Sequence, residues 1–457
     1  MSYKRSHGMS RRQFAKRGSA LAVGVSFAGM PVVHYHTAAK QDVTLTWMSN
    51  QRHDRAVKEE LFQRYADETG VTIEMQIFAD EYPDQLKLAF ESGTPPDMFN
   101  MNQPRQQVEA GWPAPLTDLL EAEPDLRDSF VSGAFVENNG IWNGETYGLP
   151  MYAQTMRLYY NRTVFENAGL DPDAPPTTWS EMLEYSNQIS ENSGGAYGTI
   201  FGDKYPWVWE MIVEFFATGA GAYKFNWAEN AYDFTQQPTK DMLNLYIEME
   251  QAGGLFPGVH TLTDDDARQQ FSIGMAGMIV GGSWNPGVFN DQFTSTEDWE
   301  TAYLPLPDSG RAGKTKRYNP GDRYTFSAQT EYPEECWEFL KWLYSVEVMT
   351  EMYEKGMGVM GVADANTGDS EVRGVSLLAP TEDEQVPPPE PELPQQTPDW
   401  VTVYQTIFDE PDTMDQALQD VTDQYNTAYE QAVADGLLNA DDFHIADWDP
   451  LNWTPES

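Results

Sequence analysis

Val43-Thr44-Leu45-Thr46-Trp47 opens the run of segments that decides the fold class of this 457-residue chain. Apolar and polar residues alternate along it and most of them favour β structure, so the stretch predicts a strand. A helical pattern follows over residues 52–69 and stops before Gly70. Residues 71–77 alternate again, which predicts a second strand. The order strand, helix, strand is typical of a parallel α/β unit.

The same order continues beyond the second strand. A short helix is expected over 84–91, and Pro95-Pro96 holds the backbone extended ahead of a third strand over 97–101. In a parallel sheet the ligand cleft lies beyond the carboxyl ends of the strands. We therefore expect the residues that end or follow the first and third strands, at 48–50 and 100–103, to face a cleft.

The overall charge of the chain excludes several classes of partner. The sequence holds 72 acidic and 28 basic residues, which gives a formal net charge of −44. Such a chain repels phosphate backbones and anionic lipid, so we expect no nucleic-acid or membrane-surface binding. Because so acidic a surface also repels itself unless salt screens it, the composition indicates a halophile, and we expect a haloarchaeon. The length indicates two or three folding units of about 150 residues each.

Residues 1–40 are typical of an export signal and not of a folded domain. Ser10-Arg11-Arg12-Gln13-Phe14-Ala15-Lys16 resembles the twin-arginine motif, and a weakly apolar run rich in Ala, Gly and Val follows over 18–33. No cysteine follows that run, so the sequence predicts no lipid anchor. Cleavage of the signal and its retention as an N-terminal anchor both stay open. The rest of the chain is expected to be extracellular or at the cell surface.

Residue types that carry catalysis or bind metals are not arranged for either task. Cys336 is the single cysteine, so no internal disulfide or cysteine-based zinc site is possible, and its helical surroundings indicate a buried thiol. Ser283 lacks the second glycine of a nucleophile elbow. Asp264-Asp265-Asp266 follows Thr263, a pattern typical of a helix start, where acidic residues interact favourably with the helix dipole. The three residues lack the spacing of a calcium-binding loop, so we favour the helix start. We expect no catalytic residue, metal or cofactor, although chance pairs among the carboxylates leave a glycosidase as a distant alternative.

Four ordered segments carry a family resemblance. They are Ser92-Gly93-Thr94-Pro95-Pro96-Asp97-Met98-Phe99 with Gly111 to Leu119; Thr146-Tyr147-Gly148-Leu149-Pro150 with the stretches 158–161 and 165–170; Pro176-Thr177-Thr178-Trp179-Ser180-Glu181; and Phe271 to Met278 with Gly281-Gly282-Ser283-Trp284. Their order and spacing resemble the extracellular solute-binding proteins of the carbohydrate-uptake type, the group that includes maltose-binding protein. Two features depart from the resemblance: Gly277 stands where the family usually has Ala, and the proline-rich stretch 380–398 is longer than expected.

The resemblance implies an α/β fold of two interwoven lobes hinged around a cleft, the type II periplasmic-binding-protein architecture. Each lobe would be a mixed, mostly parallel sheet flanked by helices. Pro150 and the extended Leu304-Pro305-Leu306-Pro307 predict two crossings between the lobes, and 380–398 is expected to be an extended surface excursion. We place lobe one at 41–152 plus 306–345, and lobe two at 153–305 plus 346–457.

Candidate ligand-binding residues combine aromatic faces, which suit the C–H side of a sugar ring, with polar groups that suit its hydroxyls. By position, Asn100 and Asn102 follow the third strand, Trp47 suits either the cleft or the core, and Asp97 suits either a hydroxyl or a turn cap. The resemblance implies that Trp284 stacks on ligand, that a loop around 205–207 presents a ring, and that the segment at 322–324 lies beside the cleft or forms a salt-bridged turn. The full set is Trp47, Asn50, Asp97, Asn100, Asn102, Tyr152, Tyr205, Trp207, Gly282, Trp284, Asp322 and Tyr324.

The resemblance implies a receptor and not an enzyme. We expect a monomeric extracytoplasmic component of an ABC importer, which closes on a sugar or oligosaccharide and delivers it to a membrane permease. A binding protein for a non-sugar solute, such as glycerol phosphate or a peptide, remains an alternative. Because an anionic ligand needs convergent Arg or Lys, and Lys204 and Arg323 are the obvious candidates, an uncharged ligand is favoured.

Overall fold

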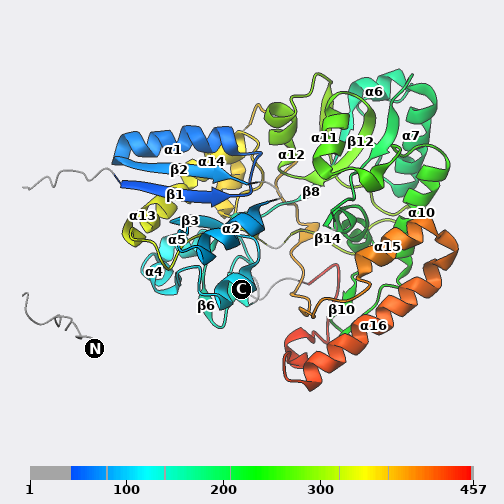
Figure 1. Cartoon of the computed structure of the whole chain (residues 1–457). Coiled ribbons are helices and arrows are strands. Elements are labelled where there is room, and N and C mark those ends of the chain that lie inside the picture. The colour runs from blue at the N-terminus through cyan, green and yellow to red at the C-terminus, as the bar shows by residue number, and fades with distance from the viewer. Residues whose placement is uncertain are drawn as a thin grey trace, which may run out of the picture. The chain divides into compact units, whose positions relative to one another are not determined.

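Two mixed sheets, each beside its own hydrophobic core, form the framework of the chain (Figure 1). The computed structural model describes residues 43–78, 81–137, 140–205, 207–318, 320–368 and 370–453. The expected α/β class with helices flanking mixed sheets is confirmed. The export signal predicted over 1–40 lies outside the described residues.

The first sheet has the strand order β2-β1-β3-β15-β7. β1 runs parallel to both β2 and β3, whereas β15 lies antiparallel to β3 and to β7. The first three strands confirm the predicted succession, and β15 joins them from much later in the sequence. The strand bounds are β1 Val43–Ser49, β2 Val71–Ile77, β3 Met98–Met101, β7 Leu149–Tyr152 and β15 Gly321–Phe326.

Helices from two distant parts of the sequence cover the first sheet. Figure 1 shows the late helices α13 and α14, in yellow, beside the early strands β1 and β2. Helix α1 ends at Gly70, whose φ of 78° allows the left-handed turn that stops it. Burial raises the pKa of the Cys336 thiol on α13 to about 12, and the predicted buried thiol is confirmed. The helices are α1 Arg55–Thr69, α2 Tyr82–Glu91, α3 Pro104–Glu109, α4 Thr117–Glu121, α5 Pro124–Asp128, α13 Pro333–Leu343 and α14 Val346–Glu354.

The second sheet has the order β13-β8-β12-β9. Its central strand β12 is buried along its whole length and runs antiparallel to β8 and parallel to β9. The bounds are β8 Met156–Asn161, β9 Tyr197–Ile200, β12 Ala276–Gly282 and β13 Trp299–Ala302. Small sheets comprise β4 Val136–Glu137, β5 Gly140–Trp142 and β6 Glu145–Thr146; β10 Phe225–Asn226 and β11 Ala231–Tyr232; and β14 Thr315–Lys316 with β16 Glu384–Gln385.

The helices of the second lobe include one whose start explains a motif of the sequence. In Pro176-Thr177-Thr178-Trp179-Ser180-Glu181, Thr178 caps helix α7 and Glu181 bonds back to it, which closes a capping box. None of the described helices is both long and apolar enough to span a membrane. The helices are α6 Arg162–Asn167, α7 Trp179–Asn192, α8 Trp207–Trp209, α9 Phe215–Gly219, α10 Gln237–Gln251, α11 Asp264–Ser272, α12 Asn285–Gly287, α15 Trp400–Asp409 and α16 Met414–Ala434, with π-helical turns at Glu210–Glu214 and Val288–Gln292.

The boundaries between the lobes differ from those expected. Helix α14 and the segment that follows it pack into the first core through Met349, Met357 and Leu378, so 346–378 belongs with lobe one. Conversely, the amide of Trp179 donates to the carbonyl of Leu306, and β14 pairs with β16, so the chain returns to the first sheet only near 318–321. The expected crossing at 304–307 was wrong because those prolines pack along the second lobe.

The proline-rich stretch 380–398 is not simply a surface excursion. Val386, Pro387 and Pro388 are buried, and the indole of Trp227 donates to the carbonyl of Pro389 at 3.1 Å. The hydroxyl of Tyr232 donates to the carbonyl of Pro391 at 2.8 Å. Because proline has no amide hydrogen to pair, its free carbonyls suit such side-chain donors. The stretch is extended as expected, but it lines the second core.

Candidate functional site

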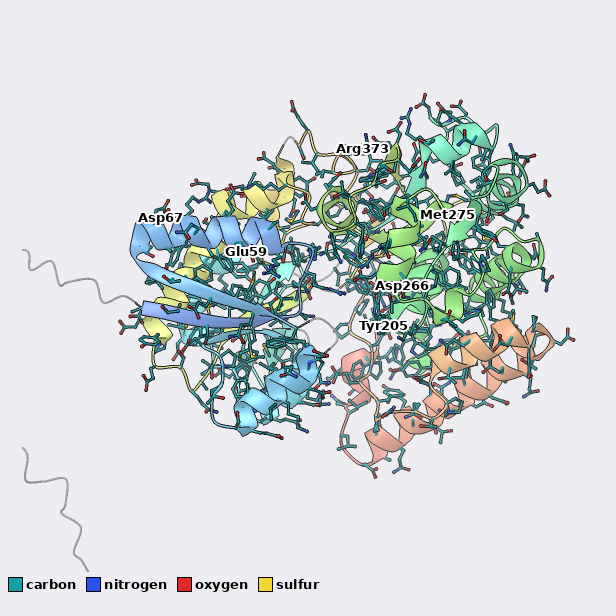
Figure 2. All side chains as sticks on the ribbon, turned by 45° about the horizontal axis from the view of Figure 1, so that its top comes forward. Glu59, Asp67, Tyr205, Asp266, Met275 and Arg373 are labelled. Atoms are coloured by element: carbon teal, nitrogen blue, oxygen red, sulfur yellow. The ribbon has the colours of Figure 1, made fainter. Side chains whose placement is uncertain are left out.

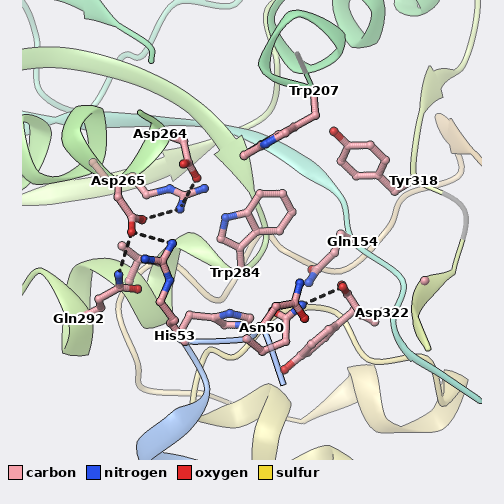
Figure 3. Close-up of a pocket in the computed structure, with 16 residues that line it drawn as sticks. Asn50, His53, Gln154, Trp207, Asp264, Asp265, Trp284, Gln292, Tyr318 and Asp322 are labelled. Carbon is pink, nitrogen blue, oxygen red and sulfur yellow. Dashed lines mark hydrogen bonds and ion pairs between the residues drawn. The ribbon is translucent and has the colours of Figure 1, made fainter. Parts of the chain in front are cut away.

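A cavity of about 470 Å³ is lined by residues of the first lobe and by loop and helix residues of the second lobe (Figure 3). This volume falls within the range of about 300–1,000 Å³ that is usual for small-molecule sites. Its lining mixes aromatic, amide and charged side chains: Asn50, Gln51, Arg52, His53, Tyr152, Gln154, Trp207, Asp264, Asp265, Arg268, Trp284, Val288, Gln292, Tyr318, Gly321 and Asp322.

The first lobe supplies the loop that follows β1. Asn50 accepts a hydrogen bond from Asn100 at 3.0 Å, which fixes the orientation of its amide. Gln51 donates to a carboxylate oxygen of Asp322 at 2.8 Å, so the loop after β1 and the start of β15 hold each other in place. His53 contacts the carbonyl of Met357, and burial lowers the pKa of its imidazole. The loop lies at the carboxyl end of β1, as the sequence predicts for a parallel sheet.

The second lobe supplies two indole rings. Trp284 follows β12 and Trp207 begins α8, and their rings meet edge to face with centroids 6.4 Å apart (Figure 3). Both side chains are half-buried, so part of each ring faces the cavity. Tyr318 lies on the same side of the cavity and packs against Phe215 at 4.8 Å. Aromatic faces of this kind suit the C–H groups of a sugar ring.

Charged residues of α11 line the wall beside Trp284. Arg268 pairs with Asp264 at 2.7 Å and with Asp265 at 3.0 Å, and its guanidinium lies 5.9 Å from the ring centre of Trp284. Arg52 reaches from the first lobe to Asp265 at 2.8 Å. Burial raises the pKa of Asp264 against the attraction of Arg268. Both guanidinium groups are therefore already neutralised by carboxylates.

A buried charged network lies next to this cavity. Asp54 and Lys58 are both fully buried and form an ion pair at 2.7 Å. The hydroxyl of Tyr152 donates to Asp54, and the ammonium of Lys58 donates to the hydroxyl of Tyr324. Burial lowers the pKa of Lys58. Burial also acts to raise the pKa of Asp54, but the charges of Lys58 and His53 and the hydrogen bonds from Lys58 and Tyr152 together hold it below its ordinary value. The network ties the ring of Tyr152 to helix α1.

Asp322 is the carboxylate of the cavity that no arginine or lysine neutralises directly. Its φ of 49° lies in the left-handed region, which Asp tolerates better than most residues. Among the described residues it forms no ion pair, and its resolved partner is the amide of Gln51. Burial raises the pKa of Asp322 to about 6, against the attraction of Lys58 and with a further contribution from Asp54.

The cavity brings together five of the twelve residues proposed from the sequence. These are Asn50, Tyr152, Trp207, Trp284 and Asp322. They come from five separate parts of the chain, and each is held by contacts of its own lobe. Whether they contact a ligand stays a prediction.

Three of the other proposed residues are part of the first core and do not line the cavity. Trp47 is fully buried against Phe62, and its indole donates to Asn100 at 2.9 Å. Asn100 is buried as well, and Tyr324 is buried with its hydroxyl against Lys58. For Trp47 the alternation of β1 decides in favour of the core. The cleft position expected for Asn100 is corrected, because its amide orients Asn50 instead.

The remaining four proposed residues also have structural contacts. Asp97 accepts from the backbone and hydroxyl of Thr46 at 2.9 Å and from Thr330, so it joins neighbouring strands and caps no turn. Asn102 accepts from Gln107 at 2.7 Å. Tyr205 is half-buried, and its carbonyl accepts from Val208 at the start of α8 (Figure 2).

Gly282 acts on the site through Trp284. A methyl group at this position would lie 1.9 Å from Cζ3 of the indole, so the glycine makes room for the ring. At Gly281 the methyl group would lie 2.1 Å from Nδ2 of Asn285. The space beside both glycines is thus taken by side chains, and contact of Gly282 with a ligand stays a prediction.

Several cavity residues were not proposed from the sequence. Gln51, Arg52 and His53 directly follow Asn50, so the rule for strand ends could have included them. Asp264 and Asp265 belong to a helix start, as expected, because Thr263 caps α11 in a capping box with Asp266. Asp264 and Asp265 also line the cavity, whereas Asp266, in the same turn, is exposed (Figure 2). Among the described residues no group of three or more His, Cys, Asp or Glu side chains could hold a metal ion.

Two lobes that contribute to one aromatic cavity define the class of two-lobed α/β binding proteins. The chain belongs to the family of bacterial extracellular solute-binding proteins, and the match covers residues 49–350. A binding protein of Brucella abortus is 23% identical over 289 residues, which span 61% of this chain and 66% of that protein. The arabinooligosaccharide-binding protein of Halalkalibacterium halodurans is 25% identical over 275 residues, 58% of this chain and 59% of that protein. The matches thus span just under two thirds of the relatives' length.

The fold is also found among solved structures. An ABC transporter solute-binding protein from Thermotoga lettingae, solved with bound α-D-tagatose, superposes with a TM-score of 0.67 at 22% sequence identity. The superposition covers 84% of this chain and 99% of that chain. The likeness extends over both sheets and supports the two-lobed architecture.

Proposed function

We propose that this chain is the extracytoplasmic substrate-binding component of an ABC importer and that it binds a sugar or oligosaccharide. The observation that carries the proposal is the cavity in which Trp207 and Trp284 present aromatic faces opposite the amides of Asn50, Gln51 and Gln154. Stacking on the indoles holds the apolar side of a sugar ring, and the amides can donate to and accept from its hydroxyls. The arabinooligosaccharide-binding relative supports a ligand of this class.

Binding is proposed to close the lobes around the ligand. Polar groups on both lobes line the cavity, so a ligand that fills it contacts both and favours the closed arrangement. Ser283 of the second lobe donates to Gln154 on the segment that crosses after β7, and the amide of Val359 in the first lobe donates to Ser283. These contacts join the two lobes at one end of the cavity, where a hinge would bend.

The proposed delivery route requires export of the chain. Arg11 and Arg12 would direct a folded protein through the twin-arginine pathway, without a lipid anchor at a cysteine. The receptor would then act as a monomer and present its closed form to a membrane permease. Replacing both arginines by lysine should leave the protein inside the cell. Export of the double variant at the level of the unaltered protein would contradict this route.

A non-sugar anion such as glycerol phosphate fits the cavity less well. Arg52 and Arg268 line it, but each already pairs with a carboxylate at 2.8 Å or less. A phosphate would have to displace Asp265 or Asp264 from these guanidinium groups and would meet the charge of Asp322. We therefore favour an uncharged or cationic ligand over an anionic one.

A thermal-shift screen of the purified protein at high salt tests the function. Sugars, oligosaccharides, polyols and phosphate esters would be compared at equal concentration. Because a ligand that binds only the folded state raises the melting temperature, at least one sugar or oligosaccharide should do so and the phosphate esters should not. Stabilisation by phosphate esters alone, or rapid hydrolysis of a glycoside by the pure protein, would overturn the proposal.

A further inference from the structure

Asp322 differs from the other carboxylates around the cavity in lacking a basic partner. Asp264 and Asp265 pair with Arg268, and Asp265 also pairs with Arg52. Asp322 forms no ion pair within the described part of the chain, although it lines the cavity wall. Only one of its oxygens has a resolved hydrogen bond, from Gln51 at 2.8 Å.

The charges around the cavity do not balance. The carboxylates that line it or lie in the adjoining network are Asp54, Asp264, Asp265 and Asp322, and the basic groups are Arg52, Lys58 and Arg268. One negative charge remains, and its place is the Asp322 end of the cavity, because the other carboxylates have ion-pair partners. The net charge of −44 on the whole chain adds to the attraction for cations.

Aromatic rings surround the same space. Trp207, Trp284 and Tyr318 line the cavity on the second lobe, and Figure 3 shows Trp284 between the Asp264–Asp265 side and the side of Asp322. The face of an indole attracts a cation through its quadrupole. The guanidinium of Arg268 already lies 5.9 Å from the centre of the Trp284 ring, so this ring accepts a cation in the unliganded protein.

We propose that the ligand carries a protonated amine, which Asp322 receives beside the rings of Trp207 and Trp284. The substrate class is then an unacetylated amino sugar or an oligosaccharide that contains one. This inference rests on the proposed sugar-binding function and narrows it.

The chemistry of the pocket favours an ammonium group over a hydroxyl at this position. A hydroxyl gives the carboxylate one neutral hydrogen bond, whereas an ammonium gives a charge-assisted bond and neutralises the remaining charge. The raised pKa of Asp322, about 6, reflects a carboxylate that burial leaves poorly solvated. Binding of a cation would compensate for the lost solvation, while binding of a neutral sugar would not.

Calorimetry with matched ligands tests the proposal on the purified exported protein at about pH 7, where a sugar amine is largely protonated. Each ligand is offered as a triple that differs only in the group at C2 of each ring: the hydroxyl, the free amine or the N-acetylated amine. The triples are glucose, glucosamine and N-acetylglucosamine, their galactose counterparts, and the β-1,4-linked disaccharides of the glucose series. In at least one triple the free amine should bind about 10-fold or more tighter than both neutral twins.

The variant Asp322→Asn identifies the residue responsible. Asn also tolerates the left-handed backbone at this position, so the loop should keep its conformation. The variant should lose the preference for the amine, so that the free amine binds no tighter than its neutral twins, because an amide offers the ammonium no charge-assisted hydrogen bond. The matched control Asp67→Asn removes a carboxylate from the exposed face of α1 (Figure 2) and should keep the preference.

The pH dependence supplies a second readout. The charged or titratable groups near Asp322 are Lys58 of α1, Asp54 just before that helix, His53 of the loop after β1, Tyr152 of β7, Tyr324 of β15 and Tyr344 beyond α13. The tyrosines have pKa values raised well above the ordinary value, so they stay protonated near pH 6, whereas burial lowers the pKa of the His53 imidazole from its ordinary value of 6.5. Protonation of Asp322, whose pKa burial raises to about 6, removes the charge that attracts the amine. The preference for the amine should therefore weaken as the pH falls through about 6.

The outcomes separate this inference from the function on which it rests. Neutral twins that bind as tightly as the amine, or a preference that survives Asp322→Asn, would overturn the inference and leave sugar binding standing. A screen in which no member of any triple and no other sugar binds would overturn both.

Discussion

Gly282 and the indole of Trp284 occupy adjoining space so closely that no side chain fits at position 282. A methyl group there would lie 1.9 Å from Cζ3 and 2.2 Å from Cη2 of the ring. These atoms belong to an indole, which cannot bend out of the way as a flexible chain could. The last residue of β12 therefore sets the position of the ring that we propose stacks on ligand.

Gly282→Ala should move the Trp284 ring and weaken sugar binding by about 10-fold or more, because the stacking face would no longer lie in the cavity. Calorimetry with a sugar from the screen measures the loss. The double variant Gly282→Ala/Trp284→Ala is the control, since a glycine that acts only through the ring adds nothing once the ring is gone. Additive losses would show that Gly282 acts on the ligand directly.

Asp322→Asn should stabilise the unliganded protein at about pH 8, by about 1–3 kcal/mol. The folded-state pKa of Asp322, about 6, lies above its ordinary value of 3.8, so the folded protein binds the proton more tightly than the unfolded chain. The charged carboxylate thus destabilises the fold above about pH 6, and this cost disappears as the pH falls toward the ordinary pKa. The gain from the variant should shrink over that range.

Urea denaturation of both proteins at about pH 8 and about pH 5 measures this difference. A gain that is equal at both pH values would mean that ionisation of Asp322 costs the fold nothing. A variant less stable than the unaltered protein at both pH values would contradict the assignment of a poorly solvated carboxylate.

Lys58→Met should destabilise the protein by about 3–5 kcal/mol, because it leaves the buried charge of Asp54 without its partner. Adding Asp54→Asn to the same variant should restore part of the loss, since no buried charge remains. The free energy of unfolding from urea titration measures both effects. Arg55 forms an exposed pair with Glu59 on the same helix, so Arg55→Met should change the stability by less than about 0.5 kcal/mol. Equal losses for Lys58→Met and Arg55→Met would contradict the account.

Lowering the salt concentration should destabilise the chain. The net charge is −44, and the Debye length grows from about 3 Å at 1 M salt to about 10 Å at 0.1 M, so repulsion between carboxylates increases. The melting temperature should fall over this range and recover when salt is restored. An uncharged osmolyte at matched osmolality should not replace the salt. A melting temperature that does not depend on salt would contradict the halophile interpretation.

The sequence predicted those parts of the fold that local pattern determines. The helix expected over 52–69 is α1 Arg55–Thr69, and the strand expected over 71–77 is β2. Both have clear periodicity and end at residues that suit an end. The lobe boundary after 345 was not predictable in this way. Helix α14 has an apolar face that could serve either core, and only the tertiary contacts of Met349 and Met352 place it in the first.

Site residues could be predicted from the sequence where they follow a strand. They could not be predicted where tertiary contacts between distant segments bring them to the cavity. Asn50 was proposed because β1 ends just before it, and Trp284 because of the family segment after β12. Trp47 lies within β1 and not after it, on the face of the strand that the alternation buries. Asp264 and Asp265 were assigned only to a helix start, since no local signal shows that Arg268 and Trp284 lie beside them.

The central claim, that the cavity around Trp284 binds a sugar, is tested most directly by calorimetry of the unaltered protein beside Trp284→Ala. The titrant is the sugar that gives the largest thermal shift, and Trp453→Ala, which removes a Trp ring packed against Trp448, is the control. We predict one sugar bound per chain, unchanged affinity in the control, and an affinity at least about 30-fold lower in Trp284→Ala, with an unchanged far-ultraviolet circular dichroism spectrum. Equal affinity in Trp284→Ala and in the unaltered protein would contradict the account.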